Sequence, residues 1–198
     1  MPVSAAVADS HPSLAFEVEY VDQAGEAQRR PLELALDVPF ERVYPARSFP
    51  SLKGQSSFPG LWWAATTGCH VGYESCVERS VLMLMDFDPQ VIGLSSQPFW
   101  LCWHDGRRRR RHPPDFFARL ADGSGVVVDV RPDDLVDAKA TEVFAVTAEA
   151  CRQVGWTFRR VGAPDPVLAA NVRWLAGWLP ASAVPEPDGR RVAGVCTG

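Results

Sequence analysis

Three acidic residues stand where their carboxylates could act together on one substrate. Glu78 lies in a helical pattern, Asp115 begins a strand-like run, and Asp129 interrupts GVVVDVR, which is otherwise typical of a buried strand. A buried carboxylate needs a partner or a cation to offset its desolvation. Hard oxygen ligands suit Mg²⁺ or Mn²⁺, and such an ion can orient water and stabilise charge on a phosphodiester.

The segment between Asp115 and Asp129 predicts that the two acids come close together. ADGSG at 121–125 is a strong hairpin signal, and the hairpin pairs 115 roughly with 131. Asp129 and Arg131 are two residues apart on the same predicted strand, so their side chains share one face of it. Arginine keeps its proton at usable pH, so Arg131 can bind a phosphate but cannot act as a base. We therefore expect an acidic cluster beside a fixed cation.

Three further residues are accessory candidates for this site, each with a plainer alternative. Glu74 either joins the metal shell or faces solvent in the first turn of the helix that carries Glu78. Gln97, in SSQPF, either lines the site or merely starts a strand. Lys139 is a candidate for a displaced catalytic lysine in the helix that follows Arg131.

Five consecutive arginines, Arg107–Arg111, predict contacts with several DNA phosphates, and they lie just before the strand of Asp115. Residues 101–120 hold six basic and two acidic residues, whereas 121–151 hold two basic and seven acidic residues, within a net charge of −4. This asymmetry fits a DNA enzyme and equally fits a solvated loop on a salt-bridged surface. The run has no base-reading pattern, so no intrinsic sequence specificity is expected. His112 follows it as a phosphate contact or a general base.

Composition predicts an ordinary globular chain. Of 198 residues 46% are hydrophobic and 22% are charged. No run approaches the ~20 apolar residues of a membrane span, and Met1–Leu14 lacks the features of a signal peptide, so we expect a cytoplasmic protein without membrane contact. We divide the chain into an N-terminal extension with a β-hairpin (1–46), a main domain (47–179) and a tail (180–198) that we expect to be disordered.

Hydrophobic periodicity supplies the elements that must position these residues. The expected order is a hairpin of 14–20 and 32–38, a packed loop from Arg47 to Trp63, a helix over 74–86, strands over 91–94, 97–103, 114–120 and 125–131, a helix over 135–154, a strand over 156–162 and a helix over 166–179. This order predicts an α/β fold with a mixed central sheet flanked by helices.

The acids also carry a family resemblance. Pro114-Asp115, then Asp129-x-Arg131, preceded by a helical glutamate, resembles the PD-(D/E)XK nuclease pattern. HVGYESCVERSVLMLMDFDPQVIGLSSQPFWL, followed by PPDFFARL and VVVDVRP, is similar to the TnsA-like endonuclease subunits of heteromeric transposases, over about residues 47–179. The resemblance implies a restriction-endonuclease-like core.

The resemblance also implies roles for single residues. Glu78, Asp115, Asp129 and Val130 would bind Mg²⁺ or Mn²⁺, and Arg131 would replace the usual catalytic lysine. The protein would nick DNA at the 5′ ends of the element, with a DDE recombinase subunit and an ATPase regulator as partners. A stand-alone defence or repair nuclease remains an alternative. A non-catalytic DNA- or partner-binding module, with Asp129 and Arg131 in a buried salt bridge, is another.

Overall fold

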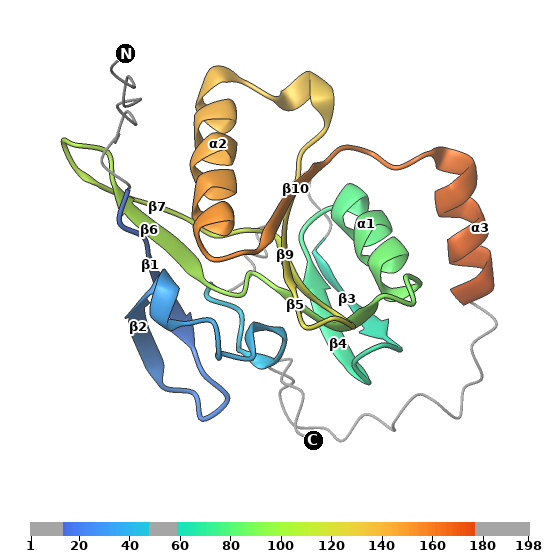
Figure 1. Ribbon diagram of the computed structural model, residues 1–198. Coiled ribbons are helices and arrows are strands. Elements are labelled where there is room, and N and C mark those ends of the chain that lie inside the picture. Colours follow the sequence, from blue (N-terminus) through green and yellow to red (C-terminus); the bar gives the residue numbers. More distant parts are fainter. Residues whose placement is uncertain (1–13, 48–58, 177–198) are drawn as a thin grey trace, which may run out of the picture.

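The computed structural model describes residues 14–47 and 59–176, which form strands in three sheets and three α-helices (Figure 1). The strands are β1 (Glu17–Val21), β2 (Ala27–Pro31), β3 (Gly60–Ala64), β4 (Cys69–Tyr73), β5 (Val91–Ser96), β6 (Trp100–His104), β7 (Arg109–His112), β8 (Phe116–Leu120), β9 (Gly125–Val130) and β10 (Thr157–Val161). The helices are α1 (Cys76–Asp86), α2 (Ala138–Gln153) and α3 (Pro166–Ala176), and short 3₁₀ turns cover Leu32–Leu34, Phe40–Arg42 and Asp133–Leu135.

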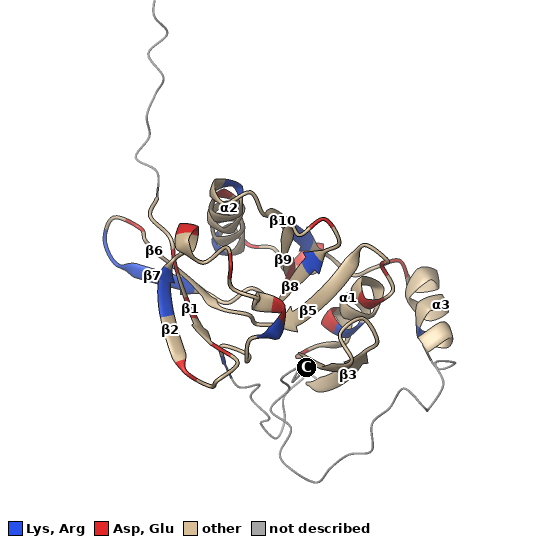
Figure 2. Cartoon of the chain, turned by 60° about the horizontal axis from the view of Figure 1, so that its bottom comes forward, with Lys and Arg blue, Asp and Glu red and all other residues tan. Residues whose placement is uncertain are grey.

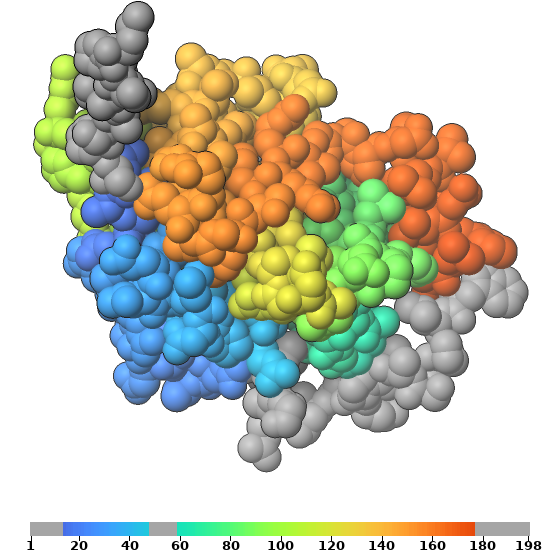
Figure 3. All heavy atoms as spheres, in the orientation of Figure 1, coloured from blue at the N-terminus to red at the C-terminus, as the bar shows by residue number. Residues whose placement is uncertain are grey.

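A mixed four-stranded sheet, in the order β10-β9-β8-β5, lies at the centre. Its strands are antiparallel except that β10 runs parallel to β9. Side chains alternate between the two faces of this sheet along each strand, and a helix packs on each face. Phe117 and Val127 point toward α2, whereas Phe116 and Val128 point toward α1. The expected mixed α/β arrangement is confirmed at this level, and Figure 3 shows α3 at the edge of the molecule, beside α1.

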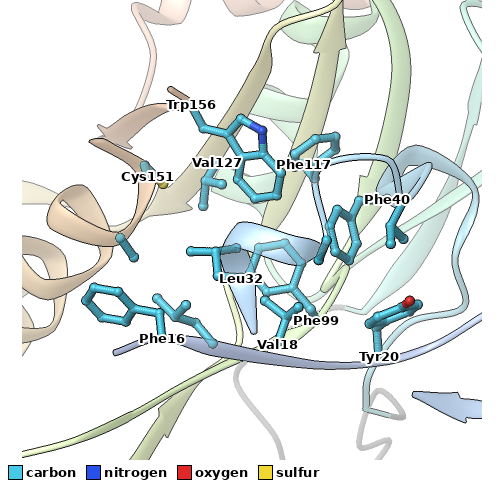
Figure 4. Close-up of a cluster of buried hydrophobic side chains, with 14 of the residues drawn as sticks. Phe16, Val18, Tyr20, Leu32, Phe40, Phe99, Phe117, Val127, Cys151 and Trp156 are labelled. Carbon is cyan, nitrogen blue, oxygen red and sulfur yellow. The ribbon is translucent and has the colours of Figure 1, made fainter. Parts of the chain in front are cut away.

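The N-terminal hairpin of β1 and β2 extends a second sheet, in the order β2-β1-β6-β7. The segment after this hairpin enters the core, where Phe40 is fully buried among aromatic rings (Figure 4). The ring centroids of Phe99, Trp156 and Phe117 lie 4.8, 5.6 and 5.7 Å from that of Phe40. The two sheets therefore share one core.

The second strand of the hairpin was predicted at 32–38, and this prediction is wrong. The carboxylate of Asp22 accepts the backbone N–H groups of Ala24 and Glu26, which closes the turn early, so β2 occupies Ala27–Pro31. Pro31 has no N–H to continue the ladder. The segment that follows buries apolar residues at a spacing of three rather than two: Leu32, Ala35 and Val38.

Other elements shift by a few residues or change type. The three predicted helices form at the positions given above, α3 within the described residues. Trp62 and Trp63, expected in a loop, lie in β3 and pair with β4. The arginine run, expected in a connector, is largely strand β7. Residues 48–58 of the predicted loop and the tail 180–198 lie outside the described residues. In the part of the chain that is described, no helix has the length and apolarity to cross a bilayer.

Candidate functional site

The hairpin of β8 and β9 places two of the predicted acids opposite each other. Phe116 pairs with Val128 across the antiparallel ladder. The next position outward sets Asp115 beside Asp129, because antiparallel partners change by one residue on each strand. The predicted register, which paired 115 with 131, is therefore wrong by two residues.

The error in register comes from the length of the turn. The backbone N–H of Leu120 donates to the carbonyl of Ser124 at 2.9 Å, so three residues rather than five connect the strands. Gly123 has a φ of 86°, the left-handed conformation that such a turn requires. The tighter turn sets Asp129 opposite Asp115, where the predicted register would have set Phe117.

Asp115 lies at the centre of a repulsive acidic cluster. Burial raises its pKa well above the usual range, and the nearby carboxylates of Asp129 and Glu78 raise it further. The backbone N–H of Val130 donates to Asp115 Oδ2 at 2.7 Å and opposes this rise. Negative charge at this point therefore lacks a counter-charge that a bound cation would supply.

Asp129 is almost fully buried, with 2% of its surface exposed, and its partner is a histidine. His112 Nε2 lies 3.0 and 2.9 Å from the two carboxylate oxygens of Asp129. The alternative of a buried salt bridge between Asp129 and Arg131 is wrong. Arg131 is exposed, and its Nε donates to the carbonyl of Leu135 at 3.0 Å.

Glu78 serves as part of a capping box at the start of α1. Its backbone N–H donates to Ser75 Oγ, while its carboxylate accepts from the Ser75 hydroxyl at 2.9 Å and from the Glu74 backbone N–H at 2.7 Å. Burial raises the pKa of Glu78, and these two hydrogen bonds oppose the rise. Glu78 is thus fixed in place at the helix N-terminus, close to Asp115.

Glu74 contacts the site through an ion pair that the sequence did not predict. Arg47 Nη2 lies 2.7 Å from Glu74 Oε2. Glu74 Oε1 and Arg47 Nε are both buried without a hydrogen-bond partner. An unsatisfied buried carboxylate oxygen beside the other acids is a ligand position that the protein itself leaves unused.

One cleft of about 430 Å³ joins these groups. Its lining includes all four predicted catalytic residues and several accessory ones: Arg47, Glu74, Glu78, His112, Asp115, Asp129, Val130, Arg131 and Lys139. Acids from α1, β8 and β9 thus share a cleft with cations from the segment after β9 and from the first turn of α2. The predicted convergence of acids beside a cation agrees with this geometry.

Gln97 is absent from the cleft lining among the described residues, although it supports the site through its backbone. Its N–H donates to the carbonyl of Asp115 at 2.8 Å. Its φ of 46° places a non-glycine residue in the left-handed region, at a cost of order 1 kcal/mol. Its amide oxygen is buried without a partner.

The predicted DNA-binding arginines lie on the hairpin of β6 and β7, where Figure 2 shows a continuous basic segment. Three of the five contact other side chains: Arg109 lies 2.8 Å from Glu19, Arg110 lies 3.3 Å from Asp105, and the Arg111 guanidinium lies 4.2 Å from the centroid of the Trp100 ring. Arg107 and Arg108 are exposed in the turn. Part of the basic charge is therefore already engaged within the protein.

The donor set of the cleft fits a hard divalent cation, although no ligand set is preformed. Within residues 14–47 and 59–176, no three His, Cys, Asp or Glu side chains already converge as a metal site. Both oxygens of Asp129 face His112, and those of Glu78 are engaged in the cap. The unpartnered Oε1 of Glu74 and the raised pKa of Asp115 nevertheless suit Mg²⁺ or Mn²⁺. Asp115, Asp129 and the Val130 carbonyl would hold it.

Sequence reasoning missed the parts played by His112 and Arg47. A signal for His112 existed, because alternation along a strand puts it on one face with Arg110, and only two prolines separate it from Asp115. Arg47 carried no local signal, since it precedes α1 by almost thirty residues and meets Glu74 only in the fold.

Comparisons with known proteins add little to this geometry. No protein-family model matches the chain, and no curated protein matches it. A crystal structure of protein VC1899 from Vibrio cholerae aligns with 54% of this chain at 12% sequence identity and a TM-score of 0.29. The chain spans 32% of that protein's length. A similarity of this size carries no argument about fold or function.

Proposed function

We propose that this chain is a metal-dependent DNA endonuclease, acting as the subunit of a heteromeric transposase that nicks DNA at the 5′ ends of the element. A DDE recombinase subunit would cut the other strand, and an ATPase regulator would select the site. The transposase context comes from the resemblance of residues 47–179 alone. The nuclease activity has independent support in the cleft.

One observation carries the nuclease proposal. Asp115 and Asp129 lie opposite each other on neighbouring strands, and Glu78 from α1 lies close enough to raise the pKa of Asp115. Arg131 and Lys139 line the same cleft. Adjacent buried carboxylates with cations beside them are an arrangement that phosphodiester hydrolysis uses and that fold stability alone does not require.

The residues of this chain divide the work in the reaction. A bound Mg²⁺ or Mn²⁺ supplies positive charge for the phosphorane-like transition state and lowers the pKa of water. Asp115 and Asp129 hold the cation, and Glu78 adds negative charge beside them. Arg131 remains charged throughout, so its guanidinium binds the scissile phosphate and does not accept a proton. Lys139 provides a second cation in the same cleft.

A second candidate, a DNA- or partner-binding module without catalysis, is favoured by a different observation. His112 engages both oxygens of Asp129, and the cap of α1 engages those of Glu78. If these contacts persisted in the presence of Mg²⁺ and DNA, neither Asp129 nor Glu78 could serve as a metal ligand. The two candidates therefore differ in whether the carboxylates exchange their partners for a cation.

Strand nicking by the full chain tests the proposal. Wild type, D115N, D129N and the control D134N, an exposed acid beyond β9, are each mixed with the recombinase subunit and a plasmid carrying the element ends. We expect Mg²⁺-dependent nicks at the 5′ ends with wild type and D134N and none with the other two. Nicks of equal rate with D115N and D129N would refute the nuclease assignment. Cutting by wild type without the recombinase would favour the stand-alone nuclease.

A further inference from the structure

His112 has an unusual position relative to Asp129. Its Nε2 lies 2.9 Å from one carboxylate oxygen and 3.0 Å from the other, so the ring nitrogen sits between them. A donor that merely supports a metal-binding carboxylate normally contacts the oxygen that the metal does not use. The near-equal distances instead place the N–H where a cation shared by both oxygens would lie.

Among the described residues around Asp129, no group other than His112 balances the negative charge of its carboxylate in the metal-free protein. The side chain of Asp129 is 3% exposed and that of His112 is 22% exposed. Asp115, opposite on β8, is itself an acid and repels Asp129. Arg131 is exposed, and its Nε donates to the carbonyl of Leu135 rather than to Asp129. Within the described residues His112 is therefore the group that compensates the buried charge of Asp129.

The strand that carries His112 can move more easily than the strand that carries Asp129. β7 has only four residues and pairs with β6 alone, at the edge of its sheet. β9 lies inside the central sheet, between β8 and β10. A short edge strand has fewer hydrogen bonds to open than an inner strand, so we expect the histidine rather than the aspartate to move when a ligand competes for Asp129.

We propose that His112 and the divalent cation compete for the carboxylate of Asp129, so that His112 sets how tightly the site binds metal. The inference rests on the proposed function, because it takes Asp129 as a metal ligand. His112 is then a positioning residue that satisfies a buried acid until the cation replaces it. If His112 instead supported the metal-bound carboxylate, it would stay hydrogen-bonded to one oxygen of Asp129 and would strengthen metal binding.

Mn²⁺ titration of the full chain by calorimetry, at one fixed pH and without DNA, separates the two arrangements. A hydrogen bond to a charged acceptor is strong enough that its loss should tighten Mn²⁺ binding by H112A about tenfold or more. H104A is the matched control, since His104 is an exposed histidine on the neighbouring strand β6, at the other end of the β6–β7 ladder from His112. Its Mn²⁺ affinity should equal that of wild type. Unchanged or weaker binding by H112A would overturn the proposal.

Thermal melting gives a readout that a purely structural role would not produce. In EDTA, H112A should melt below wild type, because Asp129 stays buried without its partner. Saturating Mn²⁺ should then raise the melting temperature of H112A more than that of wild type. An equal rise in both proteins would count against competition.

Nuclear magnetic resonance of the wild-type imidazole nitrogens covers the case in which H112A does not fold. Mg²⁺ titration should shift the His112 Nε2 resonance in step with metal binding, as the N–H leaves the carboxylate. A resonance unchanged at Mg²⁺ saturation would overturn the proposal.

D129N separates failure of the inference from failure of the proposed function. If D129N abolishes Mn²⁺ binding while H112A does not tighten it, Asp129 is a ligand and only the competition is wrong. If D129N binds Mn²⁺ as wild type does, the metal site itself is misassigned and both ideas fail.

Discussion

Replacing Asp115 with asparagine should stabilise the metal-free protein while removing its metal-dependent activity. The asparagine side chain keeps an oxygen that can accept the N–H of Val130, which now donates to Asp115 at 2.7 Å. It removes a charge that burial and the neighbouring acids Asp129 and Glu78 all disfavour. The substitution therefore deletes an unfavourable charge without deleting a hydrogen bond.

The size of the gain follows from the spacing of the two strands. For a typical separation of about 6 Å between the carboxylates of cross-strand neighbours, two charges repel by about 3 kcal/mol at an effective dielectric constant of about 20. We expect D115N to raise the free energy of unfolding by about 1–3 kcal/mol at pH 8 in EDTA.

The gain should depend on pH with a definite sign. A carboxyl group whose pKa is raised by folding holds its proton more tightly in the folded state, so wild-type stability falls as pH rises through that raised pKa. D115N lacks this loss. Its advantage should be largest at pH 8 and should vanish toward pH 4, near the ordinary pKa of an aspartate.

Urea unfolding of wild type, D115N and the exposed-site control D134N from pH 4 to pH 8 measures this difference. D134N should follow wild type at every pH. A D115N protein that is no more stable than wild type at pH 8 would refute the claim that Asp115 is an uncompensated buried acid. A gain that is constant across the pH range would also refute it.

Three further results are expected. R107A/R108A should weaken DNA binding and lower the slope of log K against log salt by up to ~0.9 per lost phosphate contact, and an unchanged slope would show that the turn does not touch DNA. R131K should slow single-turnover nicking about 10- to 100-fold, and R131A should slow it further. Because Arg131 is exposed, the free energy of unfolding of both variants should stay within about 0.5 kcal/mol of that of wild type. A large loss of stability would contradict this. Burial raises the pKa of the Cys151 thiol to about 12, whereas Cys76 is exposed. Mass spectrometry after iodoacetamide treatment at pH 8 should therefore find Cys76 modified and Cys151 intact. Equal labelling of the two cysteines would contradict this packing.

The sequence predicted the elements whose pattern is local. GVVVDV is a β-branched run beside a Gly-containing turn, and β9 forms there. Ser75 and Glu78 stand at the spacing of a capping box, and α1 begins after Ser75. The acids on these elements could be placed in one site because short-range geometry links Asp115 to Asp129 and the helix carries Glu78.

Long-range pairing had no such signal. β6 pairs with β1, about 80 residues earlier in the chain, and not with a strand of the central sheet. This pairing brings β7 alongside and delivers His112 to Asp129. Periodicity marks a strand and its buried face but does not choose its neighbour, so the sequence offered Arg131 as one possible partner of Asp129 and gave no sign of the contact with His112.

Anomalous diffraction from crystals of the full chain soaked in Mn²⁺ tests the central claim most directly. We expect a manganese peak at about 2.1 Å from oxygens of Asp115 and Asp129 and from the Val130 carbonyl, with the His112 ring moved off Asp129. No peak in this cleft at saturating Mn²⁺, with His112 still between the two Asp129 oxygens, would contradict a metal-dependent nuclease.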